Sequence, residues 1–392
     1  MNLNRVFTLA ALLLTVTTVA VSAENESLAS IFTNATPGRP HVLPRRTSVM
    51  VLAFRGLGRG DLSCYGQTNF QTPNLDRLAG EGMRFSDYRA AGDDLATAQS
   101  VLMAGDPAGL AAGLPTLAQR LRQAGYATGL IGEWALGSQT WTQGLDDFAG
   151  YFNDQETADY YPAFLWRTAP LSLHDRTNGM APKIIRERLY ANEGGKHEYY
   201  MPDAYLDLAA SFVRIHLPDK ANHYQPFFLL VSLPMPHSIT PGKDVYPVPT
   251  DAPYSSEAWP QAAKNRAALI MHLDTAVGRL FASLQRLPLT NNLAVFITGA
   301  TAPEKFADTN LDFLTLPGEV RGGSSPERFR APMIVRWPKH VPADSVNPTP
   351  WSAADFAATA LDIAYAKPEH LAGTSLLPVL LGKTNWLAVP HQ

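Results

Sequence analysis

The chain has 392 residues, of which 46% are hydrophobic and 17% are charged, and its formal net charge is −3. This apolar content supports a large buried core and excludes an intrinsically disordered chain. The small negative charge gives no indication of a nucleic-acid partner or of binding to an anionic membrane face. The length suits one large α/β domain or two domains of ordinary size.

The first 23 residues have the pattern of an export signal. Arg5 precedes an apolar run over 6–21, and the segment ends in Val-Ser-Ala at Ala23. This pattern predicts a secretory signal peptide cut after Ala23, and therefore an exported protein in the periplasm or outside the cell. The alternative is an uncleaved anchor, but the run is only marginally long enough to span a membrane, so we expect no stable membrane anchor. Residues 24–47 form a polar, proline-rich leader.

From residue 48 onward, apolar runs of strand length alternate with amphipathic helical patterns. This alternation predicts an α/β domain over 48–392, with a mostly parallel central sheet and helices on both faces. The expected strands are 48–54, 126–131, 226–233, 292–298 and 332–336, and the expected helices are 74–82, 115–124, 203–215, 261–286 and 352–363. The stretch from about 150 to 200 is aromatic and rich in loops. The sole cysteine, Cys64, cannot form an internal disulfide, and we interpret it as a small buried residue beside a turn.

Several segments match one enzyme family in the family's order. Residues 49–66 read VMVLAFRGLGRGDLSCYG, and TPNLDRLA follows at 72–79. The later matches are LPTL at 114–117, GEWALG at 132–137, GLDDF at 144–148, Pro-His at 236–237, HLDTAVGR at 272–279, RAPMIVRWP at 330–338 and LAGTSLLP at 371–378. Together they resemble a type I sulfatase, an arylsulfatase-like branch of the alkaline-phosphatase superfamily. The resemblance covers most of the chain, but the C-terminal antiparallel subdomain of that family is expected to be reduced or absent.

The resemblance implies a fold and a set of catalytic groups. Sulfate-ester hydrolysis in this family uses a calcium ion held by oxygen ligands, which polarises the sulfate. A cysteine oxidised to formylglycine supplies the nucleophile. Lysine and histidine side chains bind the sulfate and protonate the leaving group.

Most of these groups are replaced in this chain. The four metal-ligand positions correspond to Arg55, Gly56, Gly299 and Ala300, so neither calcium nor formylglycine is expected as a cofactor. The catalytic positions correspond to Leu95 for the nucleophile, Gln99 for the motif arginine, Glu133 for the sulfate-binding lysine and Ala135 for its neighbouring histidine. His237 is retained, and Arg321 is a candidate for a further lysine position.

These replacements favour a degenerate, catalytically inactive pseudo-sulfatase that binds a ligand or partner through the vestigial cleft. The ligand would be a sulfated or other anionic glycan, with a protein partner as the alternative. The alternative function is a sulfuric ester hydrolase, or another ester hydrolase, with an atypical active site. In that case Thr97 or Ser100 is the candidate nucleophile, although no histidine lies nearby in sequence. The aromatic residues at 160–161 and 164–166 are candidates for stacking on sugar rings or, alternatively, for packing.

The charge reversal at Arg55 and Glu133 leads to a structural prediction. The family has an acid at the first position and a base at the second, and both point into one pocket. A lone arginine buried at a strand end would carry a desolvation cost of several kcal/mol. We therefore predict an ion pair between Arg55 and Glu133. In the alternatives, both side chains turn toward water, or Arg55 stands beside His237 and Arg321 and holds an anion.

Overall fold

The computed structural model describes residues 46–383 except 112, 154–155, 157–159, 170–179, 218–224, 241, 288, 290 and 367–370. The predicted signal peptide and nearly all of the leader lie outside the described residues, as do residues 384–392. The body from Arg46 onward forms one compact unit.

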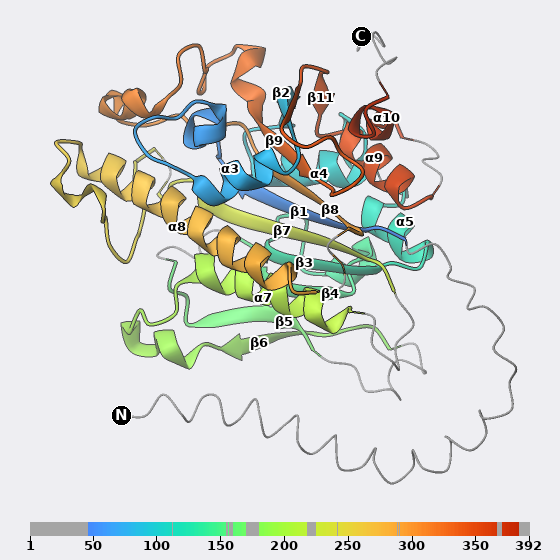
Figure 1. Cartoon of the computed structure of the whole chain (residues 1–392). Coiled ribbons are helices and arrows are strands. Elements are labelled where there is room, and N and C mark those ends of the chain that lie inside the picture. Colours follow the sequence, from blue (N-terminus) through green and yellow to red (C-terminus); the bar gives the residue numbers. More distant parts are fainter. Residues whose placement is uncertain are drawn as a thin grey trace, which may run out of the picture. The chain divides into compact units, whose positions relative to one another are not determined.

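The centre of this unit is an eleven-stranded sheet (Figure 1). Its strands are β1 (Ser48–Arg55), β2 (Met83–Arg89), β3 (Ala127–Glu133), β4 (Asp147–Tyr151), β5 (Phe164–Thr168), β6 (Ile184–Arg188), β7 (Phe227–Pro236), β8 (Leu293–Gly299), β9 (Arg330–Arg336), β10 (Ser345–Asn347) and β11 (Trp351–Ser352). Their order is β10-β2-β9-β8-β1-β7-β3-β4-β5-β6, and β11 also pairs with β2. The five strands from β8 to β4 are parallel, whereas β9, β5 and β6 pair antiparallel with the strand before them in that order. The predicted mostly parallel sheet is confirmed.

Strand β1 shows why this sequence makes a central strand. Its residues from Ser48 to Phe54 are all buried, as expected for a strand covered on both faces. Because side chains alternate between faces, Met50, Leu52 and Phe54 enter one hydrophobic cluster, and Val49, Val51 and Ala53 enter the other. The sheet therefore separates two cores.

Helices cover both faces of the sheet (Figure 1). One core contains side chains from α3 (Pro73–Gly80), α7 (Met201–Ile215) and α8 (Gln261–Leu284). The other contains side chains from α4 (Leu95–Ala104), α5 (Leu117–Gln123), α9 (Asp355–Ile363) and α10 (Leu377–Leu380). The expectation of helices on both faces is confirmed.

Two of the family-matching motifs, HLDTAVGR at 272–279 and LPTL at 114–117, contain residues that cap helix starts. Asp274 of α8 accepts hydrogen bonds from the backbone N–H groups of Asn74 and Leu75, at 3.1 and 2.7 Å, and so caps the start of α3. Thr116 and Gln119 form a reciprocal capping box at the start of α5. The Asp274 contacts fix the start of α3 against α8, and the capping box satisfies the first backbone groups of α5.

Helix α8 is long and apolar enough to cross a membrane by length and composition alone. Two thirds of its apolar window is buried inside the protein, and the helix packs against α7 and α3. It is therefore a core helix of this domain.

All five predicted strands and all five predicted helices are present, with ends shifted by a few residues. The sequence prediction missed α4, whose residues lack a clear polar face. It also missed α10 and the strands β2, β4, β10 and β11. It missed β5 and β6 too, which lie within the stretch described as rich in loops. These strands pair with each other at the edge of the sheet, and β6 is mostly exposed. Edge strands do not carry the continuous apolar run that identifies a central strand.

Candidate functional site

The sheet brings the ends of four predicted strands together at its carboxyl edge. Strands β8, β1, β7 and β3 are neighbours in that order and run parallel, so their C-terminal residues share one edge. Phe54 pairs with Gly299, and Arg55 pairs with Pro236. Ligands of open α/β sheets bind outside this edge. Segments far apart in the sequence therefore meet where a ligand is expected.

Arg55 and Glu133 form an ion pair across the end of β7. The Nη1 atom of Arg55 lies 3.4 Å from Oε1 and 3.5 Å from Oε2 of Glu133. The exposed fractions of the two side chains are 15% and 6%, so both charges are largely removed from water. The predicted pairing is confirmed, and the alternative in which both side chains turn outward is wrong. Removing either partner would leave the other as a partly buried charge.

Gln99 links α4 to the strand ends. Its Nε2 atom donates to the carbonyl of Glu133 at 2.8 Å and to the hydroxyl of Ser232 at 3.0 Å. Its Oε1 atom accepts the backbone N–H of Ala135 at 2.8 Å. The side chain is buried, and its amide is used to hold β3 and β7 in place. Ala135 contributes only its backbone to this arrangement.

The nucleophile position is the first residue of α4. Leu95 is buried with 4% exposure, and it follows Asp94, whose carboxylate caps the helix by accepting the backbone N–H of Thr97. Thr97 is exposed, while the hydroxyl of Ser100 accepts the backbone N–H of Leu110. Neither hydroxyl is hydrogen-bonded to a histidine in the described part of the chain. Among the described residues, no histidine is therefore positioned to activate Thr97 or Ser100, and the Thr97 side chain is hydrogen-bonded to the carboxylate of Asp94.

Gly56 and Ala300, two of the positions that the resemblance assigns to metal ligands, act through their backbones. The N–H of Gly56 donates to the hydroxyl of Thr301 at 3.0 Å, and the N–H of Ala300 donates to the carbonyl of Phe54 at 2.8 Å. Gly56 has a φ of +74°, which glycine adopts without steric cost. These bonds hold the loop that follows β8 against the end of β1.

This arrangement does not fit the calcium ion that the resemblance implies. Calcium takes about six to eight oxygen ligands, mainly from carboxylates and carbonyls. Gly56, Gly299 and Ala300 have no side-chain oxygen, and Arg55 brings a positive charge. Across the described residues, no group of three or more His, Cys, Asp or Glu side chains is placed to hold a metal ion.

The retained His237 lies beside an acid that the sequence analysis missed. Its Nδ1 atom is 2.7 Å from the carbonyl oxygen of Ser238 and 3.4 Å from Oε1 of Glu304. Burial lowers the pKa of His237, and Glu304 only partly opposes that shift. The ring is therefore neutral at neutral pH, with Nδ1 donating to Ser238 and Nε2 left as an acceptor. Such a ring can accept a proton but carries no charge that would attract an anion.

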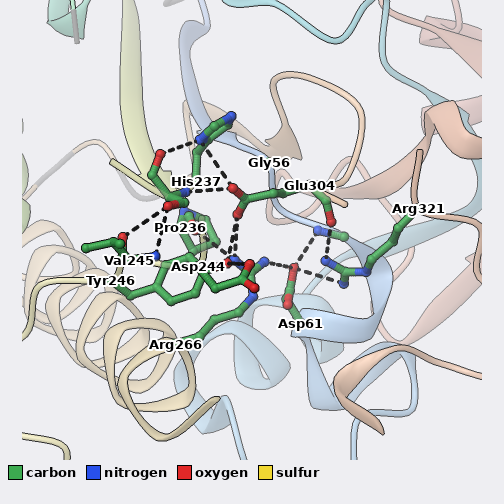
Figure 2. Close-up of polar contacts among 12 residues, drawn as sticks. Gly56, Asp61, Pro236, His237, Asp244, Val245, Tyr246, Arg266, Glu304 and Arg321 are labelled. Atoms are coloured by element: carbon green, nitrogen blue, oxygen red, sulfur yellow. Dashed lines mark hydrogen bonds and ion pairs between the residues drawn. The ribbon is translucent and has the colours of Figure 1, made fainter. Parts of the chain in front are cut away.

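Glu304 belongs to a buried network of charged side chains (Figure 2). Arg266 donates to Asp61 at 2.9 Å, to Glu304 at 3.1 Å and to the carbonyl of Pro236 at 2.8 Å. Arg321 lies 3.3 Å from Asp61. Asp61 and Arg266 are fully buried, and the Arg321 side chain is 4% exposed. Arg321, the candidate sulfate-binding residue, is therefore already paired within the protein.

The network is stabilised by charge and by aromatic contacts. Burial favours the neutral form of Asp61, but the guanidinium groups of Arg266 and Arg321 hold its pKa below the usual value. The guanidinium groups of Arg266 and Arg321 also lie 5.0 and 4.9 Å from the ring centre of Phe306. Glu319 pairs with Arg321 at 3.3 Å. Buried arginines and carboxylates therefore pair with one another beside Gly56, where an added Cβ would meet Glu304 and His237.

The aromatic candidates mostly serve packing. Tyr160 is buried, and its hydroxyl donates to the carbonyl of His237 at 3.0 Å. Phe164 lies under the guanidinium of Arg186, and Trp166 donates to Glu156. Tyr161 stacks on His197 with ring centres 4.5 Å apart. The structure therefore supports packing for Tyr160, whereas Tyr161, Phe164 and Trp166 are partly exposed and contact His197, Arg186 and Glu156.

The fold defines an alkaline-phosphatase-like α/β protein, in which a mostly parallel sheet lies between two helical layers. A sulfatase family model matches residues 49–366, and the chain belongs to this family.

Relatives in this family include N-acetylgalactosamine-6-sulfatase of Sus scrofa, which is 26% identical, with 86% of this chain and 66% of the relative covered. N-acetylgalactosamine-6-O-sulfatase of Bacteroides thetaiotaomicron is 27% identical, with 86% and 77% covered. The solved structure of Ps i-CgsB in complex with k-i-k-neocarrahexaose superposes with a TM-score of 0.66 at 23% identity, covering 86% of this chain and 76% of that one. The chain spans slightly less than two thirds of the length of the pig relative.

Proposed function

We propose that this protein is an exported member of the sulfatase family that lacks sulfuric ester hydrolase activity and binds a sulfated or other anionic glycan through the vestigial cleft. The observation that carries the proposal is the ion pair between Arg55 and Glu133. It occupies the strand ends where the resemblance places a metal ligand and a sulfate-binding lysine. A protein partner at the same cleft is the alternative occupant.

The chemistry of the site supports binding without turnover. Leu95 has no heteroatom that could become a nucleophile, and Gln99 and Ala135 are used to hold β3. Without a positively charged cofactor or a general acid at Glu133, the developing charge on a sulfate ester would lack stabilisation. Arg55 still offers a guanidinium group whose geometry suits sulfate oxygens once Glu133 releases it. The N-acetylgalactosamine-6-sulfatase relatives make a sulfated amino sugar the natural first ligand to test.

A second candidate is an active ester hydrolase with an atypical site. It is favoured by the relatives that are named as sulfatases and by His237, whose ring is oriented by Ser238 and lies near Glu304. Such an enzyme would need a nucleophile within reach of the Nε2 atom of His237. The next experiment separates the two candidates.

The purified protein is expected not to hydrolyse aryl sulfates or N-acetylgalactosamine 6-sulfate. Leu95→Cys alone should not restore activity, because the resulting thiol would still lack a cation and a charged sulfate-binding group. Release of the phenol or of sulfate would be followed with and without chelator. Turnover that resists chelation, scales with protein concentration and disappears in His237→Ala would establish the hydrolase instead.

The variant Glu133→Gln is expected to bind N-acetylgalactosamine 6-sulfate at least about tenfold more tightly than the wild type, a change of about 1.4 kcal/mol. The physical reason is that the carboxylate competes for Arg55 at 3.4 Å, where a unit charge contributes about 5 kcal/mol at an effective dielectric of 20 before reorganisation is deducted. The melting temperature of this variant should be lower without ligand and should rise with the sulfated sugar. Titration calorimetry would measure the affinity.

Three controls accompany this titration. Glu187→Gln removes the same charge from an exposed ion pair with Arg167 on the edge strands, and it should leave affinity unchanged. Arg55→Met should abolish the gain when combined with Glu133→Gln. Unsulfated N-acetylgalactosamine should bind all variants equally. Equal binding of the sulfated sugar by wild type and Glu133→Gln would contradict the proposed role of Arg55.

A further inference from the structure

Four arginines gather at the carboxyl edge of the sheet, beside the paired ends of β2 and β9. Arg89 ends β2 and pairs with Arg330, the first residue of β9. Because β9 runs antiparallel to β8, Arg330 lies near the same edge as Gly299. Arg59 follows β1, and Arg328 precedes β9. The neighbouring strands thus bring together side chains from three separate parts of the sequence.

The carboxylate of Glu327 sits among these arginines. Its Oε1 atom accepts a hydrogen bond from Arg89 at 2.9 Å, and its Oε2 atom lies 2.6 Å from Nε of Arg330. The hydrogen bond from Arg89 lowers the pKa of Glu327, and the charges of Arg89, Arg330 and Arg59 add to this effect. Glu327 therefore holds its negative charge between the guanidinium groups of Arg89 and Arg330, and the charge of Arg59 adds to theirs.

Positive charge is in excess around Glu327. Asp87 lies 3.4 Å from both Arg89 and Arg330, and Asp93 pairs with Arg328 at 2.6 Å. Four arginines thus face three carboxylates, counting Glu327, while Asp94 caps α4 instead. When Glu327 leaves, four guanidinium groups face two carboxylates. The contact between Asp93 and Arg328 also connects this cluster to the loop that leads to Leu95.

The Glu327 side chain is more exposed to solvent than the two arginines that hold it. Its side chain is 43% exposed, whereas Arg89 and Arg330 are 34% and 32% exposed. Exposed ion pairs of this kind contribute little to stability, so replacing the carboxylate by another anion costs little free energy. The buried Nε atom of Arg59 has no hydrogen-bond partner among the described residues. A sulfate group offers more acceptor oxygens than a carboxylate and can use donors that Glu327 leaves open.

We propose that Arg59, Arg89 and Arg330 form an anion subsite that Glu327 occupies when no ligand is bound, and that a sulfate group of the ligand displaces this carboxylate. The inference rests on the proposed function only in that the sulfate belongs to the glycan held at the neighbouring cleft. It adds a specificity: the ligand carries at least two anionic groups, one for Arg55 and one for this arginine subsite.

Inorganic sulfate tests the arginine subsite without any glycan. Glu327→Gln is expected to bind sulfate about fivefold more tightly than the wild type at constant ionic strength, the factor that one exposed ion pair of about 1 kcal/mol represents. Adding Arg330→Met to Glu327→Gln should remove this gain. Adding Arg55→Met should leave it intact. Glu187→Gln, which alters net charge equally on the edge strands, should show no gain. Titration calorimetry gives the dissociation constants.

Several results would overturn the inference. An unchanged sulfate affinity in Glu327→Gln would show that Glu327 does not compete for an anion. A gain that depends on Arg55 and persists in Arg330→Met would place the sulfate in the cleft instead. If Arg330→Met does not fold, Arg89→Met replaces it, because Arg89 donates to the same carboxylate.

A glycan titration separates this inference from the proposed function. A disulfated oligosaccharide should lose affinity in both Arg55→Met and Arg330→Met, whereas a monosulfated one should depend on Arg55 alone. Loss of binding only in Arg55→Met, for both oligosaccharides, would retain the proposed function and refute the arginine subsite. Suppose instead that inorganic sulfate binds Glu327→Gln more tightly, that Arg330→Met removes this gain, and that neither oligosaccharide binds. This result would retain the arginine subsite and refute the proposed function.

Discussion

Arg266→Met is expected to lower the free energy of unfolding by about 3–5 kcal/mol, because removing one partner of a buried ion pair leaves the others uncompensated. Arg266 is fully buried and hydrogen-bonds to Asp61, to Glu304 and to the carbonyl of Pro236. Methionine fills a similar length but offers no donor to these three acceptors. For a chain of this size, the melting temperature should fall on the order of 5–10 °C.

Arg279→Met is the matched control on the same helix. The Arg279 side chain is 52% exposed and pairs with Asp203 at the surface, so its loss should cost no more than about 1 kcal/mol. The double variant Arg266→Met with Asp61→Asn should recover part of the lost stability, because it also removes one of the buried negative charges. Urea denaturation would measure all three. A melting temperature of Arg266→Met equal to that of the wild type would show that the network does not stabilise the fold.

The parts of the structure that the sequence predicted are those with local or repeated signals. Strands β1, β7 and β8 consist of continuous apolar runs, because both of their faces are buried. The order of parallel strands then places their C-terminal residues at one edge. Since Arg55 and Glu133 have charges opposite to those of the family, their ion pair could be predicted before any coordinates were known.

The buried network around Arg266 could not be predicted in the same way. Asp61, Arg266, Glu304 and Arg321 come from four segments, and no local pattern specifies which residues of distant loops will meet. One signal was available within α8. Arg266 and Asp274 both fall on the buried stripe that includes Ala263, Ala267 and Ile270, and a charge on the apolar face of a helix requires a buried partner. Asp274 caps α3, and Arg266 forms the centre of the network.

The edge strands and the arginine subsite were missed for a related reason. Strands β5 and β6 are recognised by their mutual pairing and not by an apolar run. Arg89 and Arg330 each resemble ordinary surface residues in the sequence, and only the antiparallel register of β2 and β9 places them side by side. Composition and motif spacing therefore do not predict charge clusters that depend on the register of a sheet.

Restoring the lost carboxylates is expected to destabilise the protein without restoring a calcium site. In Gly299→Asp, the added Cβ would lie 2.6 Å from the carbonyl oxygen of Leu57 and 2.9 Å from Cβ of Ala331. Overpacking of this kind costs about 1–3 kcal/mol. In Gly56→Asp, the added Cβ would meet Glu304 and His237 at 3.3 and 3.4 Å. The new carboxylate would also repel the acid of Glu304.

The double variant Gly56→Asp with Gly299→Asp should therefore unfold at a lower temperature than the wild type, and calcium should not reverse the loss. Gly318→Asp is the control, because Gly318 also has a left-handed backbone, with φ of +79°, but no atom within 4 Å of the added Cβ. The melting temperature of this control should fall only slightly, because of its backbone conformation and the added charge. Differential scanning calorimetry with calcium or with chelator would compare the variants.

The wild type should melt at the same temperature with calcium and with chelator, because the four positions that the resemblance assigns to metal ligands carry no side-chain oxygen. Arg55 pairs with Glu133, Arg266 pairs with both Asp61 and Glu304, and Arg321 also pairs with Asp61. A ligand that binds only the native state raises the melting temperature in proportion to its concentration relative to its dissociation constant. An increase in melting temperature with calcium that saturates and is reversed by chelator would reveal a metal site. It would contradict the expectation that the protein binds no calcium and the role given to these arginines.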